Sequence, residues 1–116
     1  MIVEDNKINQ MIIKKMLSET KASLLLVENG LMAVNKVKEG GIDLILMDIQ
    51  MPVMDGVTAC KIIKKLINCP PVIALTANVM EEDITNYLNS GFDAHLGKPL
   101  ELDNLNKTLT EYLLSK

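Results

Sequence analysis

The sequence predicts an α/β domain in which a parallel sheet carries crossover helices on both faces. Three observations predict this fold class. Short apolar segments recur at intervals of roughly twenty residues, amphipathic segments with helical spacing lie between them, and glycine or proline follows several of the amphipathic segments. With 116 residues the chain has the length of one domain, and residues 1–116 are assigned to it.

The apolar segments are the predicted strands. A continuous apolar run is typical of a strand that is buried on both faces of a sheet, and alternation with helices favours parallel pairing. The first segment is shorter than a central strand should be, which suggests that the chain begins inside a longer one. The predicted strands are residues 2–3, 24–27, 44–47, 72–75 and 94–96.

The first predicted helix begins after Asn6, which is a suitable N-terminal cap. Its apolar residues recur three and four positions apart and so form one side of an amphipathic helix. They are Ile8, Ile12, Ile13, Met16 and Leu17.

The other helices end at residues that interrupt helical structure. The second stops at Gly40 and Gly41, the third before Pro70, and the fourth at Gly91. The predicted ranges are about residues 30–39, 57–67, 81–89 and 101–114.

The composition excludes several classes of function. The net charge is −3 and every cationic side chain is a lysine, so direct nucleic-acid binding is not expected. The apolar runs are far shorter than a bilayer span, and we expect a cytoplasmic domain without membrane contact. Cys60 and Cys69 have neither metal-ligand nor disulfide-framework spacing, which favours two reduced thiols. The partner is therefore expected to be a protein.

The methionines are interpreted as packing residues of the core and loops. They include Met11, Met16, Met47, Met51 and Met54.

Residues with carboxylate, hydroxyl or ammonium side chains follow several of the predicted strands. Glu4 and Asp5 follow the first strand, Asp48 the third, Thr76 the fourth and Lys98 the fifth. The carboxyl ends of parallel strands share one edge, where ligands bind at the point of strand-order reversal.

If the first and third strands are neighbours, Glu4, Asp5 and Asp48 converge at that edge. Two carboxylates about 4 Å apart repel by roughly 4 kcal/mol at an effective dielectric of 20. The cluster therefore requires a counter-ion, and Mg²⁺ is the hard cation that carboxylate oxygens suit. A metal, the Thr76 hydroxyl and the Lys98 ammonium around Asp48 indicate phosphoryl transfer, with Asp48 as the nucleophile.

Four separated motifs carry a family resemblance over essentially the whole chain. In their order and spacing, "VEDN", "DLILMDIQMPVMDG", "VIALTAN" and "GKP" resemble the receiver domain of two-component response regulators. The resemblance implies a flavodoxin-like (βα)5 fold with strand order 2-1-3-4-5. It also implies that Asp48 accepts a phosphoryl group from a phosphohistidine.

The same resemblance assigns the other site residues. Glu4, Asp5, Asp48 and the Gln50 backbone carbonyl would bind Mg²⁺. Thr76 and Lys98 would contact the phosphoryl oxygens, and the Lys98–Pro99 peptide bond would be cis. Gln50 and Asn78 would tune the lifetime of the acyl phosphate.

The segments "EDNKINQ", "DIQMPVMDG" and "ALTAN" are similar to those of receivers fused to hybrid sensor histidine kinases. The implied partner is a histidine phosphotransfer domain or the kinase's own dimerisation domain, and the parent chain would be a transferase that an inner membrane could anchor. The domain itself would catalyse its own phosphorylation and dephosphorylation, as a monomer or weak dimer. A free-standing response regulator is the alternative.

One position departs from the family pattern. Three residues before Lys98 the family usually has Tyr or Phe, whose ring moves inward as Thr76 shifts, and here the residue is His95. Burying a protonated imidazole is costly, so switching through His95 would depend on pH. Filling a half-buried position is the alternative role.

Each site residue also has an ordinary explanation when taken singly. Glu4 and Asp5 could cap a helix, Asp48 could begin a turn, and Lys98 could be a solvated charge. Other classes fit less well. A phosphatase with an aspartate nucleophile needs a second acid where Gln50 stands, and a nucleotide carrier needs a phosphate loop where the sequence is acidic. A degenerate receiver acting only in binding would not need every site position filled.

Overall fold

The computed structural model describes residues 1–18, 24–49, 54–66, 69–76, 81–97 and 100–113. The strands among them form one sheet, in which every neighbouring pair is parallel. In chain order they are β1 (Ile2–Val3), β2 (Leu26–Val27), β3 (Ile45–Asp48), β4 (Val72–Thr76) and β5 (Ala94–Gly97). The order across the sheet is β2-β1-β3-β4-β5, which confirms the predicted flavodoxin-like arrangement.

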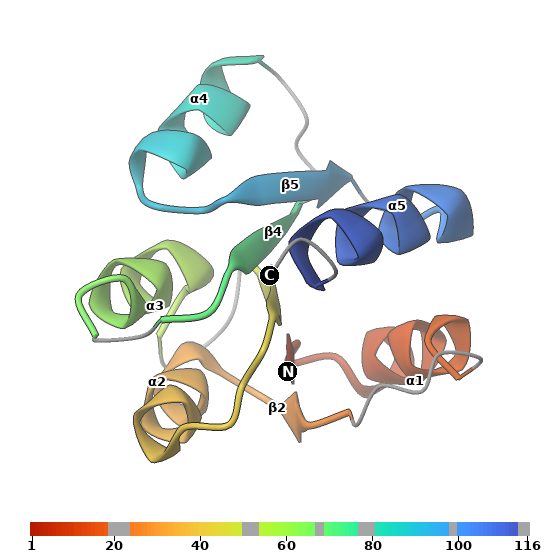
Figure 1. Cartoon of the computed structure of the whole chain (residues 1–116), viewed down its shortest axis with the longest axis horizontal. Helices are drawn as coiled ribbons and strands as arrows, with labels where there is room; N and C mark the ends of the chain where they lie inside the picture. The colour runs from red at the N-terminus through yellow and green to blue at the C-terminus, as the bar shows by residue number, and fades with distance from the viewer. Residues whose placement is uncertain (19–23, 50–53, 67–68, 77–80, 98–99, 114–116) are drawn as a thin grey trace.

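Helices follow the strands and cover both faces of the sheet. They are α1 (Lys7–Met16), α2 (Gly30–Glu39), α3 (Gly56–Ile63), α4 (Glu81–Asn89) and α5 (Leu102–Leu113). Figure 1 shows α2, α3 and α4 on one side and α1 and α5 on the other. In the described part of the chain no helix is both long enough and apolar enough to cross a membrane.

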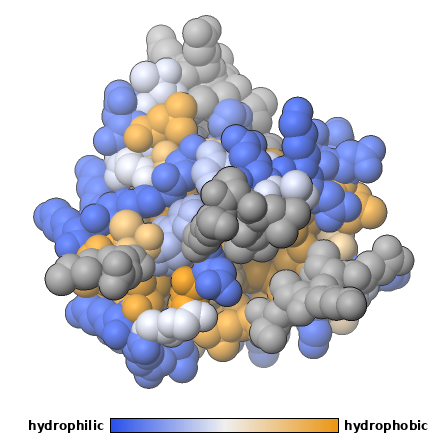
Figure 2. Space-filling view, in the orientation of Figure 1, coloured by the Kyte–Doolittle hydropathy of each residue, from blue (hydrophilic) through white to orange (hydrophobic). Residues whose placement is uncertain are grey.

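The core has two layers because alternate residues of a strand point to opposite faces. Val3 of β1 and Met47 of β3 pack with Ala59 of α3 in one layer. Ile2 and Leu46, one residue earlier on the same strands, pack in the other layer, which also contains Ile13 and Leu105. In the view of Figure 2, hydrophilic residues occupy much of the outer surface, with hydrophobic residues between them.

Several predicted elements extend beyond the observed ones, two of them by two or more residues. The strand predicted at residues 24–27 pairs only at Leu26 and Val27, because β1 offers them only Ile2 and Val3 as partners. The third helix was predicted to reach residue 67 but ends at Ile63. Beyond it the Leu66 N–H donates to the Ile63 carbonyl at 3.0 Å, a three-residue spacing that tightens the chain out of α-helical geometry.

Helix α1 does not bury the face that the four-residue spacing suggested. Ile13 of the helix and Leu17 at its C-terminal cap are buried, whereas Ile8 and Ile12 are 68% and 52% exposed. Met11 is 70% exposed, so its interpretation as a packing residue was wrong. The reason is geometric: Ile13 lies on the opposite side of the helix from this stripe and faces the sheet.

The other methionines divide by position. Met47 is fully buried in the core, and Met16 and Met54 are half-buried against it, as predicted. Met51 lies outside the described residues.

Both cysteines are free thiols, in agreement with the prediction. Cys60 belongs to α3 and is buried in the core layer on that side of the sheet. This burial raises the pKa of its thiol to about 11. Thiolates are the reactive form of cysteine, so Cys60 acts as a small core residue rather than a nucleophile.

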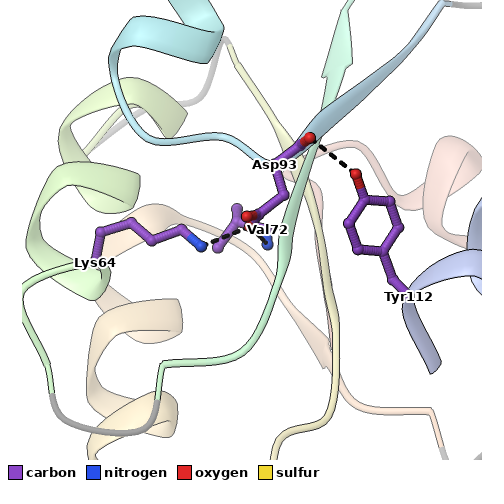
Figure 3. A network of polar contacts seen from close by, with 4 residues as sticks. All are labelled: Lys64, Val72, Asp93 and Tyr112. Carbon is purple, nitrogen blue, oxygen red and sulfur yellow. Dashed lines mark hydrogen bonds and ion pairs between the residues drawn. The ribbon is translucent and has the colours of Figure 1, made fainter. Parts of the chain in front are cut away.

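Asp93 ties four elements together at the amino-terminal edge of the sheet (Figure 3). Its carboxylate accepts hydrogen bonds from the Val72 N–H at 2.8 Å and from the Lys64 ammonium at 2.5 Å. Its own N–H donates to the Val72 carbonyl at 2.9 Å, and its carbonyl accepts from the Tyr112 hydroxyl at 2.9 Å. One aspartate therefore joins the start of β4, the segment after α3, the approach to β5 and the end of α5.

Replacing this aspartate tests its contribution to stability. We expect Asp93→Ala to lower the free energy of unfolding by about 1–3 kcal/mol, because the buried Val72 N–H loses its acceptor. Urea unfolding followed by circular dichroism measures the change. Lys36→Ala is the control, since it removes only the exposed Lys36–Glu39 ion pair and is expected to cost about 0.5 kcal/mol or less. Equal stabilities of the two variants would contradict this role for Asp93.

Candidate functional site

Two buried carboxylates meet at the carboxyl-terminal edge of the sheet. Val3 of β1 is in register with Met47 of β3, so the next residues, Glu4 and Asp48, emerge side by side. Both continue the alternation of Ile2 and Leu46 and so point to the α1 and α5 side. Glu4 is 1% exposed and Asp48 is 7% exposed.

Asp5 completes a cluster of three acids. One carboxylate oxygen from each of Glu4, Asp5 and Asp48 lies within 4.8 Å of the other two. Asp5 is exposed, so the cluster opens to solvent on its side. The structure thus brings together three acids from two separate segments, as the sequence predicted.

The donor set fits Mg²⁺. The ion takes oxygen ligands at about 2.1 Å in an octahedron, which places ligand oxygens about 3–4.2 Å apart. Three carboxylate oxygens within 4.8 Å are close to that spacing. Without a cation, carboxylates at such distances repel by several kcal/mol per pair at an effective dielectric of about 20.

Glu4 and Asp5 are not the cap of α1, which was their simplest structural explanation. Asn6 is the cap, as predicted, and its side-chain oxygen accepts from the N–H groups of Ile8 at 2.8 Å and Asn9 at 3.1 Å. Helix capping therefore does not explain the two acids, which lie in the acidic cluster at the edge of the sheet.

Sequence reasoning missed the polar groups that hold Glu4. Its Oε1 accepts from the Asn6 N–H at 3.2 Å and lies 3.5 Å from the Asn9 side-chain nitrogen. Its backbone carbonyl accepts from the Gln10 side chain at 2.5 Å. The sequence feature that could have predicted these contacts is the pair of amide side chains, Asn9 and Gln10, in the segment "EDNKINQ".

Thr76 is the last residue of β4 and is 3% exposed. It is in register with Gly97, the residue immediately before Lys98. Asp48 is in register with Leu75, so Thr76 stands one residue beyond the level of Asp48 on the neighbouring strand. The hydroxyl-bearing residue thus lies at the predicted edge.

His95 lies within β5, in register with Ala74, and is half-buried. Ala74 packs in the layer of α2 and α3, so His95 shares that side of the sheet with Thr76, two residues after Ala74. The predicted residues Gln50, Asn78, Lys98 and Pro99 lie outside the described residues.

Gly56 allows α3 to begin against the end of β3. A Cβ atom at this position would stand 2.3 Å from the backbone oxygen of Asp48 and 2.9 Å from the Cα of Ile49. Asp55 caps the helix by accepting from the Thr58 N–H at 2.8 Å. Asp55 and Gly56 therefore stand at the start of α3, and the missing side chain of Gly56 lets the start of the helix lie close to the backbone of Asp48.

Comparisons with known proteins agree with this geometry. The family model described as "Response regulator receiver domain" matches residues 1–110. The chain is 36% identical over 113 residues to the transcription factor SKN7 of Saccharomyces cerevisiae, covering 97% of this chain and 18% of that protein.

It is also 40% identical over 114 residues to the signal transduction histidine-protein kinase BarA of Escherichia coli, and the match covers 97% of this chain and 12% of BarA. The chain is 41% identical to the hybrid signal transduction histidine kinase G of Dictyostelium discoideum, and the match covers 97% of this chain and 3% of that protein. The chain thus spans less than a fifth of each of these three relatives.

Solved structures give the same match. A co-crystal structure of the Saccharomyces cerevisiae histidine phosphotransfer signalling protein Ypd1 and the receiver domain of its downstream response regulator Ssk1 matches with a TM-score of 0.90 and 40% identity, covering 97% of this chain and 86% of that one. The receiver domain of a Pseudomonas aeruginosa sensor histidine kinase, with a magnesium ion coordinated in its active site cleft, matches with a TM-score of 0.89 and 37% identity, covering 97% and 93%.

Proposed function

This chain belongs to the response regulator receiver domain family, and we propose that it accepts a phosphoryl group from a phosphohistidine onto Asp48 with Mg²⁺ bound. The observation that carries the proposal is the meeting of the buried Glu4 and Asp48 carboxylates with Asp5 at one sheet edge. A buried, mutually repelling cluster of this kind is costly unless a ligand uses it. The proposal treats residues 1–116 as one receiver domain.

In the proposed reaction an Asp48 carboxylate oxygen attacks the phosphorus in line with the bond to the histidine nitrogen. The new O–P bond forms as the P–N bond breaks, and the imidazole leaves with the bonding electron pair and takes up a proton. The product is an acyl phosphate on Asp48. Positioning and charge neutralisation supply most of the catalysis in phosphoryl transfer.

Several residues support this step. Glu4, Asp5, Asp48 and the Gln50 carbonyl would hold Mg²⁺, which neutralises charge on the phosphoryl oxygens when bound. Thr76 would donate its hydroxyl to the phosphoryl group, and Lys98 would pair with it. Supporting features proposed from the family are a cis Lys98–Pro99 bond and control of acyl-phosphate lifetime by Gln50 and Asn78.

The exposed apolar stripe of α1 is proposed as the surface that receives the phosphohistidine partner. Ile8, Met11 and Ile12 lie three and four residues apart, and each is more than half exposed. The helix begins two residues after Asp5, so a partner on this stripe would reach Asp48. A histidine phosphotransfer domain, as in the Ypd1 complex, or a kinase dimerisation domain is the proposed partner.

We further propose that the domain comes from a hybrid sensor histidine kinase, because two of the similar proteins are named as histidine kinases. In that setting the parent chain would be a transferase anchored in the inner membrane. The domain itself would lie in the cytoplasm as a monomer or weak dimer, with no nucleic-acid contact. A free-standing response regulator is the alternative.

Phosphorylation with a small donor tests the site directly. Incubation with acetyl phosphate and Mg²⁺ is expected to add one phosphoryl group to the intact chain, seen by mass spectrometry. Asp48→Asn should abolish the adduct, and chelation of Mg²⁺ should slow its formation at least about tenfold, because charge neutralisation is lost. Asp103→Asn on the exposed side of α5 is the control and should react normally. An adduct that survives in Asp48→Asn would contradict the assignment.

Transfer from a protein donor tests the α1 surface. We expect Met11→Lys to slow phosphoryl transfer from phosphorylated histidine phosphotransfer domains at least about tenfold, because a charge replaces an anchor at the centre of the stripe. Phosphorylation by acetyl phosphate should be unchanged, since Met11 is 70% exposed and is not a member of the acidic cluster. Leu88→Lys on α4, where the leucine is 46% exposed, is the matched control. Equal slowing by both variants would argue against α1 as the docking surface.

The proposed switch residue predicts a pH dependence. Phosphorylation-induced chemical shift changes around β5 should be smaller at pH 6 than at pH 8, because inward movement of a protonated His95 is opposed by desolvation. NMR spectra of the phosphorylated and free protein measure them. His95→Phe should respond equally at both pH values. Identical behaviour of the unmodified chain at pH 6 and 8 would remove His95 from the switch.

A further inference from the structure

The main chain of Glu4 is fixed from two directions. On one side its N–H donates to the Val27 carbonyl of β2 at 3.0 Å. On the other side its carbonyl accepts from the Gln10 side chain at 2.5 Å. The residue stands between β1 and α1, three positions before the helix begins, so these two bonds set where its side chain starts.

The Glu4 carboxylate is oriented by the same helix. Oε1 accepts from the Asn6 N–H at 3.2 Å, and the Asn9 side-chain nitrogen lies 3.5 Å away. The Gln10 bond is the shortest of the three contacts, and both amide side chains are half-buried. The first turns of α1 thus hold both the backbone and the carboxylate of one acid of the cluster.

We propose that Gln10 is a positioning residue for the magnesium site, acting through Glu4, with Asn9 in a secondary role. The inference rests on the proposed function, because it assigns these residues to the same metal site. Groups that hydrogen-bond to metal ligands orient them and often change metal affinity by tenfold or more. Gln10 would not contact the ion; it would keep Glu4 at the place that an octahedral ion requires.

The alternative is that Gln10 only attaches α1 to the sheet. Cation selectivity separates the two roles. Mg²⁺ demands near-ideal octahedral geometry, whereas Ca²⁺ accepts irregular and more numerous oxygen ligands. A displaced Glu4 should therefore weaken Mg²⁺ more than Ca²⁺, while a purely structural loss should not change their ratio.

The experiment compares Gln10→Met with the unmodified chain by calorimetric titration with MgCl2 and with CaCl2. Methionine has a similar length but no N–H donor, and it adds no charge to the acidic cluster. Lys14→Met is the matched control, because it places the same side chain at an exposed position of α1. Loss of the Lys14 charge can only favour cation binding, which is opposite to the effect expected at residue 10.

We expect Gln10→Met to weaken Mg²⁺ binding about tenfold and Ca²⁺ binding about twofold or less, with Lys14→Met unchanged or slightly tighter. Circular dichroism and thermal unfolding without metal check that the variant is folded. If Gln10→Met does not fold, Asn9→Ala serves in its place, with the same selectivity change expected at smaller size.

Three results would overturn the inference. Mg²⁺ affinity of the variant within twofold of the unmodified chain would remove Gln10 from the metal site and leave the proposed function intact. Equal weakening of Mg²⁺ and Ca²⁺ would assign Gln10 a structural role alone. Failure of the unmodified chain to bind Mg²⁺ would instead overturn the magnesium site of the proposed function, and the role of Gln10 with it.

Discussion

The burial of two carboxylates beside each other is the constraint on which the rest of the structure depends. Glu4 and Asp48 follow neighbouring strands and are almost fully buried, with Asp5 within 4.8 Å. Each pair of charges at such a distance costs several kcal/mol at an effective dielectric of about 20, against a total stability of about 5–15 kcal/mol for a domain of ordinary size. The pairing of β1 with β3 prevents the acids from separating. The proposed Mg²⁺ would relieve this repulsion.

Helix α1 presents two different sides near this site. Ile13 and Leu17 anchor it to the sheet, and Gln10, on the same side, contacts the main chain of Glu4, whereas Met11 is exposed on the opposite side. A helix can present these three functions together because its residues recur every 3.6 positions. The helix begins two residues after Asp5, so the acidic cluster lies close to its first turn. The residue proposed to position Glu4 and the proposed docking surface therefore belong to one helix.

The two edges of the sheet divide stability and chemistry between them. At the amino-terminal edge, Asp93 makes hydrogen bonds to partners that satisfy it, including the Val72 main chain and the Lys64 ammonium. At the carboxyl-terminal edge, carboxylates meet other carboxylates. Both edges place aspartate side chains at strand ends, but the second brings three acidic side chains within 4.8 Å of one another, a donor set that suits Mg²⁺. This contrast is what marks the second edge as the functional one.

The sequence by itself determined the alternation of strands and helices, the acids at strand ends and the Asn6 cap, because these depend on local patterns and on the shared edge of parallel strands. It also predicted that Glu4, Asp5 and Asp48 meet, once β1 and β3 were taken as neighbours. Which side of α1 is buried depended on the tertiary structure, because apolar residues occupy two sides of that helix and only packing against the sheet separates them. The same holds for Gln10, whose contact with Glu4 depends on the path of the chain between β1 and α1. Spacing along a chain specifies which residues share an element, but the packing of elements against each other decides which of their side chains meet.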